Sequence, residues 1–468
     1  MTRHLTDPAP TLLRGGIVLT MEPGRRALDT GSVLFDTERI LAVGPVAEVD
    51  AHPRSAGART VDATGHVVMP GLHNTHLHSG LLRGTAESLS LWDWLKYHVD
   101  PAHRAMTPEI ARAAAELAYT EGLLAGTVSV LDMWRFQEGG AEVAAALGIR
   151  ATLAPYTADL EPYTYFETLD SNLRLLESVA DRADPLIRAW VGLEHWLYST
   201  ESGIRKAVDL ARSWETGFHT HSSESVWEVQ ECLSRFGRRP IEQFYNWGIL
   251  GEDSVVAHCV WLDDREIELL ARTGTSVAHC PCSNMKLSSG AAPVRRLREA
   301  GVTVGLGTDG EKENNNLDLV EEMKFASLLQ KVTTLDPTSG DPWDILEMAT
   351  IGGARTLGLA AVSGTLTPGK QADLITLDLR ALHLTPLLHG PDFNAAAHVV
   401  FSASGHDVDN VWVAGRRLMA DRTLLTADAD DVRRHAQDAA EELFGRVAAL
   451  RDSGDVPLRP PSTGGEGG

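Results

Sequence analysis

The middle of the chain alternates short apolar runs with segments long enough to form helices. The strand-like runs lie at residues 71–78, 127–131, 186–193, 216–221, 254–258, 276–279 and 302–308. This alternation favours βαβ units and a parallel sheet, so an α/β fold is expected. The repeated unit predicts a closed (β/α)₈ barrel of the TIM type rather than an open sheet. One helix is delimited by Thr107 as its cap, Pro108 as its first residue and Gly126 after its end.

Both ends of the chain have a different pattern, with short strands separated by turns. Because both ends share it, we expect them to pair into one small β-sandwich domain. The predicted domains are a composite sandwich of residues 1–69 and 363–426 and a metal-dependent hydrolase barrel of residues 70–362. The remainder, residues 427–468, is predicted to be a C-terminal helix followed by a disordered tail.

The composition excludes several classes of partner. The chain has 42 Lys and Arg against 64 Asp and Glu, a formal net charge of −22. Such a surface repels phosphate backbones and anionic lipids, so neither nucleic acid nor a membrane is an expected partner. No run of about 18 apolar residues occurs, and the N-terminus lacks the apolar stretch of a secretory signal. Four cysteines in this length do not make a disulfide framework, which predicts a cytoplasmic protein.

Polar residues follow or end several of the predicted strands. These residues are His76 and His78, His221 and Glu224, His258, and Asp309. Residues two apart on a strand face the same side, so the first two imidazoles could share one metal. In a barrel the carboxyl ends of all strands meet on one face, where active sites lie. The pattern therefore predicts a metal site with proton-transferring groups beside it.

The second of these strands leaves an ambiguity. His219 and His221 share one strand face, so the strand alone does not decide which of them binds the metal. Neutral imidazole suits zinc, and a nearby glutamate that is not a ligand, such as Glu224, can move protons.

Several segments together resemble the amidohydrolase superfamily. The matching stretches are residues 70–78, 221–224, 256–260, 283–287, 290–294, 307–310 and 364–378. The chain is most similar to the branch that holds S-adenosylhomocysteine/methylthioadenosine deaminases and atrazine chlorohydrolase-like triazine hydrolases. This resemblance extends from about residue 12 to residue 425.

The resemblance implies a role for each strand-end residue. The implied metal ligands are His76, His78, His221 and Asp309, so His221 is chosen over His219. Glu224 and His258 are the implied proton-handling pair, with Asp309 as a third catalytic group. Binuclear relatives need a lysine on a middle strand, and residues 186–193 contain none, so one metal ion per chain is expected. Zinc is the first choice, and three histidines with an aspartate would also accept iron or manganese.

The resemblance also implies a reaction. A bound metal lowers the pKa of water to about 7, and the metal-bound hydroxide attacks a heteroaromatic ring carbon that carries an amino group. Asp309 takes the water proton, His258 holds the hydroxide, and Glu224 protonates the ring before ammonia leaves. The chain is therefore predicted to be a homo-oligomeric aminohydrolase. Its expected substrate is a purine-, pterin- or triazine-like base or an adenosine-type nucleoside.

Two alternatives stay open. The same residues could hydrolyse a cyclic amide or amidine, or remove a leaving group other than ammonia. From a different class, the chain could be a non-enzymatic barrel that serves as a binding protein.

Loops after the strands supply the candidate substrate contacts. They are Trp94, His103, Trp134, His195, Tyr198 and Asn284. His195 lies in a segment similar to one whose histidine contacts substrate in the family. His103 stands where nucleoside-processing relatives place a ribose-binding glutamate, and a neutral imidazole is a poorer acceptor for a diol. This departure makes a free base as strong an expectation as a nucleoside, and Asp100 could replace the glutamate from a neighbouring position.

Overall fold

The computed structural model describes residues 9–37, 39–85, 87, 89 and 91–458. Residues 1–8 of the first predicted domain and the predicted tail at residues 459–468 lie outside the described residues. Within the described part, no helix is long and apolar enough to cross a bilayer. All four cysteines are free thiols.

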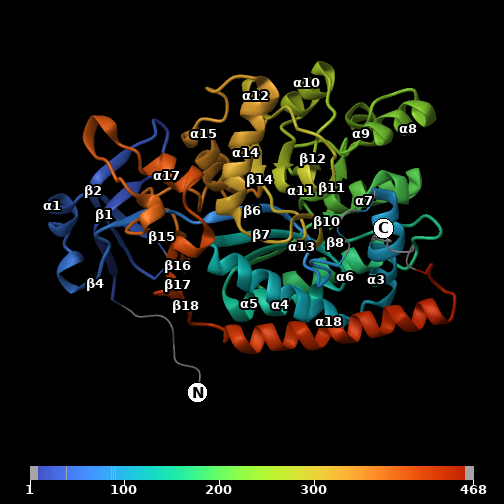
Figure 1. Cartoon of the computed structure of the whole chain (residues 1–468), viewed down its shortest axis with the longest axis horizontal. Coiled ribbons are helices and arrows are strands. Elements are labelled where there is room, and N and C mark those ends of the chain that lie inside the picture. The colour runs from blue at the N-terminus through green and yellow to red at the C-terminus, as the bar shows by residue number, and fades with distance from the viewer. Residues whose placement is uncertain (1–8, 38, 86, 88, 90, 459–468) are drawn as a thin grey trace, which may run out of the picture.

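Two parallel sheets occupy the middle of the molecule (Figure 1). The first has the order β6-β7-β8-β9, and the second has the order β10-β11-β12-β13-β14. Their bounds are β6 (Leu72–Leu77), β7 (Thr127–Trp134), β8 (Arg150–Pro155), β9 (Ile187–Ala189), β10 (Val191–Gly192), β11 (Phe218–Ser222), β12 (Ser254–His258), β13 (Ser276–His279) and β14 (Val304–Leu306). The predicted α/β class with parallel strands is confirmed. Strand β8 was missed because it opens with a charged arginine and contains alanines, which are poor strand formers.

The edge strands of the two sheets lie beside one another on both sides. Thr75 Oγ1 on β6 donates to the Leu306 carbonyl on β14 at 2.9 Å, and the Asp309 amide donates to the His76 carbonyl at 3.1 Å. On the other side, the Trp190 amide donates to the Leu153 carbonyl on β8 at 2.8 Å. These contacts bring the strand ends of both sheets to one face of the molecule.

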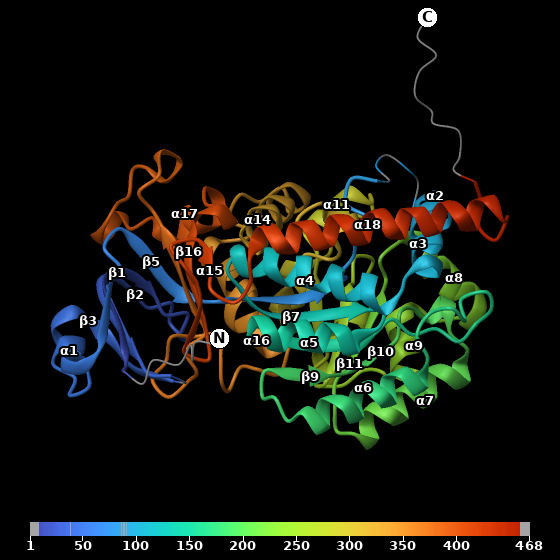
Figure 2. The ribbon, with the colours of Figure 1, turned by 90° about the horizontal axis from the view of Figure 1, so that it is seen from below.

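Helices lie around the parallel strands (Figure 2). The helix predicted after residue 107 is α4 (Pro108–Leu124), where Thr107 Oγ1 accepts the Ile110 amide at 3.3 Å and Gly126 follows with φ +88°. The longer helices among the others are α5 (Gln137–Leu147), α6 (Leu169–Arg182), α7 (Glu201–Ser213), α8 (Val226–Phe236), α9 (Pro240–Trp247), α10 (Asp264–Thr273) and α14 (Leu319–Thr334). The shorter ones include α2 (Leu91–Trp94), α3 (Asp100–Ala105), α11 (Pro281–Lys286), α12 (Val294–Glu299), α13 (Glu311–Asn314), α15 (Pro342–Glu347), α16 (Gly353–Thr356) and α17 (Ala395–Phe401).

The two ends of the chain pair into a single nine-stranded sheet beside the parallel strands (Figure 1). Its strands are β1 (Thr11–Leu19), β2 (Ala27–Phe35), β3 (Ile40–Pro45), β4 (Arg59–Asp62), β5 (His66–Pro70), β15 (Leu374–Asp378), β16 (Val408–Val413), β17 (Arg416–Ala420) and β18 (Thr423–Leu424). The junction is the antiparallel pair β5–β15, in which Met69 faces Ile375. Buried residues from both ends then meet, as in the edge-to-face contact of Phe35 with Trp412.

The predicted C-terminal helix is α18 (Ala429–Asp452), whose first amides are capped by Asp428. It packs along α4 and α3 and crosses one side of the parallel strands (Figure 2). Arg446 donates to the Ala105 carbonyl at 2.8 Å, and Arg451 donates to the Tyr97 carbonyl at 2.9 Å. Helix α18 therefore fixes the segment that precedes α4.

A buried ion pair joins the nine-stranded sheet to the parallel strands. Arg150 on β8 donates to both oxygens of Asp373, at 2.8 and 3.0 Å, and their side chains are 5% and 0% exposed. We expect Arg150→Met to lower the free energy of unfolding by about 3–5 kcal/mol, because it leaves a buried carboxylate without its partner. Urea unfolding measures this. The control is Arg14→Met, which breaks the exposed pair with Asp50, and a loss no larger than the control's would contradict the prediction.

Candidate active site

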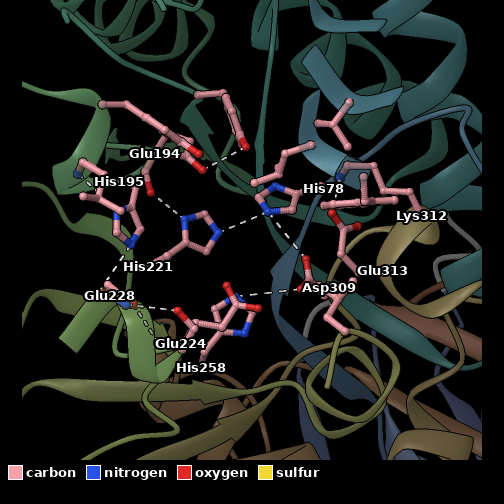
Figure 3. Close-up of a pocket in the computed structure, with 18 of the residues that line it drawn as sticks. His78, Glu194, His195, His221, Glu224, Glu228, His258, Asp309, Lys312 and Glu313 are labelled. Carbon is pink, nitrogen blue, oxygen red and sulfur yellow. Dashed lines mark hydrogen bonds and ion pairs between the residues drawn. The ribbon is translucent and has the colours of Figure 1, made fainter. Parts of the chain in front are cut away.

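Four donor atoms from three strand ends converge on one point (Figure 3 shows three of the four residues). The Nε2 atom of His221 lies 3.2 Å from the Nε2 atoms of both His76 and His78. Asp309 Oδ1 lies 3.4 Å from His76 Nε2 and 3.5 Å from His78 Nε2. The side chains come from β6, β11 and the loop after β14, and all four are buried.

The Nδ1 atoms of the three imidazoles are all used in hydrogen bonds. His78 Nδ1 donates to the Met133 carbonyl and His221 Nδ1 to the Glu194 carbonyl, each at 2.6 Å. His76 Nδ1 lies 2.8 Å from His219 Nε2, and His219 Nδ1 in turn donates to the Val255 carbonyl at 3.0 Å. Because each carbonyl can only accept, the chain of bonds leaves Nε2 of all three ligating rings without a proton.

This donor set fits a divalent metal. Three bare imidazole nitrogens and a carboxylate suit zinc, and tetrahedral bonds of about 2.05 Å separate neighbouring donors by roughly 3.3 Å. Burial is the main cause that lowers the pKa of all three histidines, so the rings are neutral as a ligand must be. Burial opposes ionisation of Asp309, but the nearby imidazoles outweigh it and hold its pKa well below the usual range.

His219 does not share in this cluster, because its Nε2 is turned to His76. Of the two rings on this strand face, His219 therefore supports His76, and His221 contributes its Nε2 to the donor cluster. Ligating histidines are generally oriented in this way by a neighbouring acceptor, which also fixes their tautomer.

Glu224 and His258 lie beside the metal donors. His258 Nε2 is 3.9 Å from Asp309 Oδ2 and 4.0 Å from Glu224 Oε2. Burial would lower the pKa of His258, but the carboxylates of Glu224 and Asp309 outweigh it and raise the pKa. The predicted proton-transferring groups and the predicted ligands are therefore within reach of a single small molecule (Figure 3).

The backbone at these positions is strained. His258 has φ +70° and Asp309 has φ +59°, values that residues other than glycine rarely adopt. Both side chains are held in place by hydrogen bonds: Asn284 Oδ1 lies 3.1 Å from His258 Nδ1, and Ser283 Oγ donates to Asp309 Oδ2 at 2.6 Å. Strain of this kind persists where the surroundings fix the geometry, as they do at active sites.

Glu228 organises the loop that carries Glu224, and the sequence prediction missed it. Its carboxylate accepts the amides of Ser223 and Glu224, each at 2.8 Å, and the Trp196 indole N–H at 3.0 Å. It also lies 3.4 Å from His195 Nε2. Burial opposes its ionisation, but the charge of His195 and these bonds lower its pKa to about 2. In the sequence, Ser225-x-x-Glu228 is a common pattern at the start of a helix. It therefore gave no indication that the Glu228 carboxylate also holds the loop of Glu224.

A pocket opens over the metal donors, and its lining includes three of the six predicted substrate contacts. Trp94, His195 and Tyr198 are among its lining residues. Trp134 is fully buried behind the wall, 5.9 Å from His78 ring to ring. Asn284 is bonded to His258, as described above.

His103 also lies behind the wall rather than in it. Helix α3 turns its ring into an aromatic cluster, stacked on Tyr156 at 4.8 Å and 4.7 Å from Trp134. Burial lowers its pKa well below the usual range, so the ring is neutral. The aligned position of a ribose-binding carboxylate is thus occupied by a packing residue.

Glu194 is a further pocket residue that was not predicted as a contact. Tyr156 donates to its Oε1 at 3.0 Å, and burial raises its pKa to about 7. Within the described chain its Oε2 has no hydrogen-bond partner. The signal available in the sequence was its position next to His195, where the family segment has a proline.

Comparisons with known proteins identify the family of the chain. Residues 67–418 match the Amidohydrolase family, and the chain belongs to it. The chain is 41% identical over 428 residues to the 5-methylthioadenosine/S-adenosylhomocysteine deaminase of Syntrophobacter fumaroxidans, covering 91% of this chain and 96% of that protein. It is similar to the zinc-bound crystal structure of an adenosine deaminase from Xanthomonas campestris, with TM-score 0.88, 33% identity and coverage of 94% and 100%.

A third comparison supports the fold alone. The zinc complex of atrazine chlorohydrolase from Arthrobacter aurescens has TM-score 0.82 at 24% identity, with coverage of 92% of this chain and 100% of that one. The predicted superfamily and branch are confirmed.

Proposed function

We propose that this protein is a metal-dependent aminohydrolase that releases ammonia from an amino-substituted heteroaromatic ring. The observation that carries the proposal is the convergence of four metal donors with Glu224 and His258 in one buried pocket. The substrate is a purine-, pterin- or triazine-like base or an adenosine-type nucleoside. The deaminase names of the Syntrophobacter and Xanthomonas relatives support the reaction class.

His76, His78, His221 and Asp309 would hold the metal, with zinc as the first choice. When bound, the metal supplies Lewis acidity and activates a water molecule as the nucleophile. The three imidazoles donate from Nε2, and their bonded Nδ1 atoms keep the rings oriented. The zinc bound in the Xanthomonas structure supports this choice.

The chain's own residues then move the protons. Asp309 Oδ2, which points to His258, accepts a proton from the attacking water, and His258 Nε2 orients that water. Glu224 delivers a proton to the ring nitrogen next to the carbon under attack. The water oxygen bonds to that carbon, Asp309 passes the proton it accepted to the amino group, and the carbon–nitrogen bond breaks as ammonia leaves. The ring nitrogen keeps the proton from Glu224, and the hydroxyl proton returns to Glu224 as the carbonyl forms. Ser289 Oγ, which donates to Glu224 Oε1 at 2.8 Å, keeps this carboxyl in position.

The test is ammonia release by the metal-loaded protein across a panel of purines, pterins, triazines and adenosine-type nucleosides. Ammonia from at least one member, with a carbonyl in place of the amino group in the product, is the expected result. Hydrolysis of a cyclic amide or amidine, or loss of a group other than ammonia, with no deamination of any member would favour the alternative reaction. Absence of turnover across panels of both kinds would contradict the enzyme and favour a binding protein.

The proposal includes an architecture. The two parallel sheets form one closed barrel, in which β9 and β10 are parts of a strand interrupted at Trp190. The hydrogen bonds between the edges of the sheets support closure. The nine-stranded sheet folds into a small sandwich made from residues 9–69 and 363–426, around a barrel of residues 70–362. The shared buried contacts of Phe35 and Trp412 support it. A crystal structure with solvent between β6 and β14, or between β8 and β10, would contradict the closed barrel.

We further propose that the protein acts in the cytoplasm as a homo-oligomer. Its four free thiols support a reducing compartment. Exposed apolar side chains on and near the contacting helices α8 and α9 support self-association. They are Val226, Trp227, Leu233, Tyr245 and Trp261. Light scattering after gel filtration that shows only monomer at micromolar concentration would contradict it.

A further inference from the structure

Two oppositely charged side chains lie in the pocket wall without a role in the proton transfers above. Lys312 and Glu313 belong to the short helix α13, which follows Asp309. They are only 4% and 6% exposed, and both line the pocket over the metal donors. Figure 3 shows them on the side of His78 and Asp309, away from Glu224. Buried charges in such a position need a reason, because taking them out of water is unfavourable.

The surrounding backbone is shaped to hold these charges. A side chain at Gly310 would collide with the Glu313 carboxylate, and one at Gly80 would lie 2.7 Å from both oxygens of Glu311. Glu311 Oε1 accepts the Leu82 amide at 2.6 Å, which anchors the start of α13. The helix is thus fixed with Lys312 and Glu313 turned to the pocket.

The pair has unused hydrogen-bonding capacity. Lys312 Nζ lies 2.6 Å from Glu313 Oε1 and 4.8 Å from the centre of the Trp134 ring. Beyond this ion pair, neither Nζ nor Glu313 Oε2 has a further hydrogen-bond partner among the described residues. An ammonium group has three donors and a carboxylate oxygen accepts, so the pair offers a donor and an acceptor side by side. Lys312 is also the one lysine or arginine among the described residues that line this pocket.

The position of the pair relative to Glu224 restricts what it can bind. In Figure 3 His78 and Asp309 lie between Glu224 and the Lys312–Glu313 pair. A ring whose amino-bearing carbon faces the metal donors therefore turns one neighbouring atom to Glu224 and the opposite edge to the pair. The edge that matches an adjacent donor and acceptor is a ring N–H next to a carbonyl.

We propose that Lys312 and Glu313 form a recognition subsite for amino-lactam rings, in which the amino-bearing carbon stands between a bare ring nitrogen and a lactam N–H. Lys312 Nζ donates to the lactam carbonyl oxygen, and Glu313 Oε2 accepts from the lactam N–H. The bare nitrogen faces Glu224. This inference rests on the proposed deamination and names its substrate class: guanine-, pterin- and isocytosine-like compounds.

The adenine ring of a nucleoside does not satisfy this pair. Beyond its amino-bearing carbon it offers the bare ring nitrogen N7 as an acceptor for the lysine, but it has no carbonyl oxygen and no ring N–H to donate to Glu313 Oε2, so it satisfies only half of the pair. A site built to bond polar groups rejects analogues that lack them far more strongly than an apolar pocket rejects a size change. The subsite therefore favours amino-lactams over adenosine-type nucleosides.

The experiment measures kcat/KM for ammonia release from guanine, pterin and isocytosine and from adenosine and 5′-deoxyadenosine. The variants are Lys312→Met, which keeps the stem and removes the charge, and Glu313→Gln, which keeps the shape. Lys206→Met, an exposed lysine on α7 outside the pocket, is the control. The ratio of kcat/KM for amino-lactams to kcat/KM for nucleosides, measured on one preparation, does not depend on the fraction of the protein that is folded. Calorimetric Kd values for the deaminated products supply a second readout.

We expect the wild-type protein to prefer amino-lactams. Lys312→Met should lower kcat/KM for them by about 10²-fold and weaken product binding, while nucleoside turnover changes by less than about 3-fold. Glu313→Gln should act in the same direction, and Lys206→Met should not change the ratio. A wild-type preference for nucleosides, or an equal loss for both classes in Lys312→Met and Glu313→Gln, would overturn the subsite and leave the deaminase proposal intact. Ammonia from no substrate at all would overturn the deaminase proposal itself.

Discussion

Glu224→Gln is expected to keep its metal and lose most of its turnover. Glu224 is not one of the four candidate metal donors. Its Oε2 lies 4.0 Å from His258 Nε2, and its side chain lines the pocket. Glutamine has the same shape and cannot deliver a proton to the ring nitrogen. Loss of general acid–base catalysis generally lowers a rate by about 10²–10⁴-fold, so kcat should fall by that factor.

Metal content and kcat need to be measured on the same preparation of this variant. Glu201→Gln is a matched control, because it makes the same change at an exposed position on α7, where Glu201 pairs with Arg205. Near-normal turnover of Glu224→Gln on the best substrate would show that another group carries the proton. Loss of metal from the variant would place Glu224 among the ligands instead.

Removal of the metal is expected to abolish ammonia release, and one equivalent of zinc per chain should restore it. The donor set of His76, His78, His221 and Asp309 is sufficient to hold one ion, and the strand at residues 186–193 has no lysine for a second. Dialysis against a chelator followed by titration with zinc measures both the loss and the stoichiometry. A requirement for two equivalents would contradict the mononuclear site.

The ligand variant His221→Ala tests the same site without a chelator. It removes one of the four donors, so metal should be lost at concentrations that saturate the wild-type protein. His219→Ala is the informative comparison, because the Nε2 atom of His219 contacts the Nδ1 atom of His76 and so supports that ring. Loss of such a supporting group generally weakens metal binding by about 10–100-fold, less than loss of a ligand.

The convergence of the candidate metal donors could be predicted from sequence because their positions follow from strand geometry, whereas their proposed roles came from the family resemblance. His76 and His78 stand two apart on one strand, and His221, His258 and Asp309 end or follow others, so parallel strands must bring them to one face. The choice between His219 and His221 was different. The strand pattern does not determine which of the two rings contacts His76 Nδ1, because that depends on side-chain packing in the folded protein.

The pocket wall was harder to predict. His103 was predicted to contact the substrate, yet α3 turns its ring to Tyr156 and Trp134, which come from other parts of the chain. Lys312 and Glu313 were missed for the opposite reason. A run of charged residues usually marks a solvated surface, and their burial depends on the room left by Gly80 and Gly310.

The strands were predictable where they are rich in β-branched residues and less so elsewhere. Strand β12, with the run Ser254–His258, matches its predicted bounds. The predicted strand at residues 186–193 is divided into β9 and β10 around Trp190, because the backbone there bonds to β8 on one side and β11 on the other. The residues of this segment alone do not predict that its first half pairs with β8 and its second half with β11.

The pairing of β5 with β15 has a consequence for how the protein is made. Met69 and Ile375 are neighbours in the sheet but roughly 300 residues apart in the chain, and ribosomes add about 5–20 residues per second. For about 15–60 s the emerging chain therefore carries β5 with an unpaired edge, a template for pairing with other chains. If synthesis stops before β15 is made, that edge of β5 stays permanently unpaired. The vulnerability of this architecture thus lies in the nascent chain on the ribosome, not in the finished molecule.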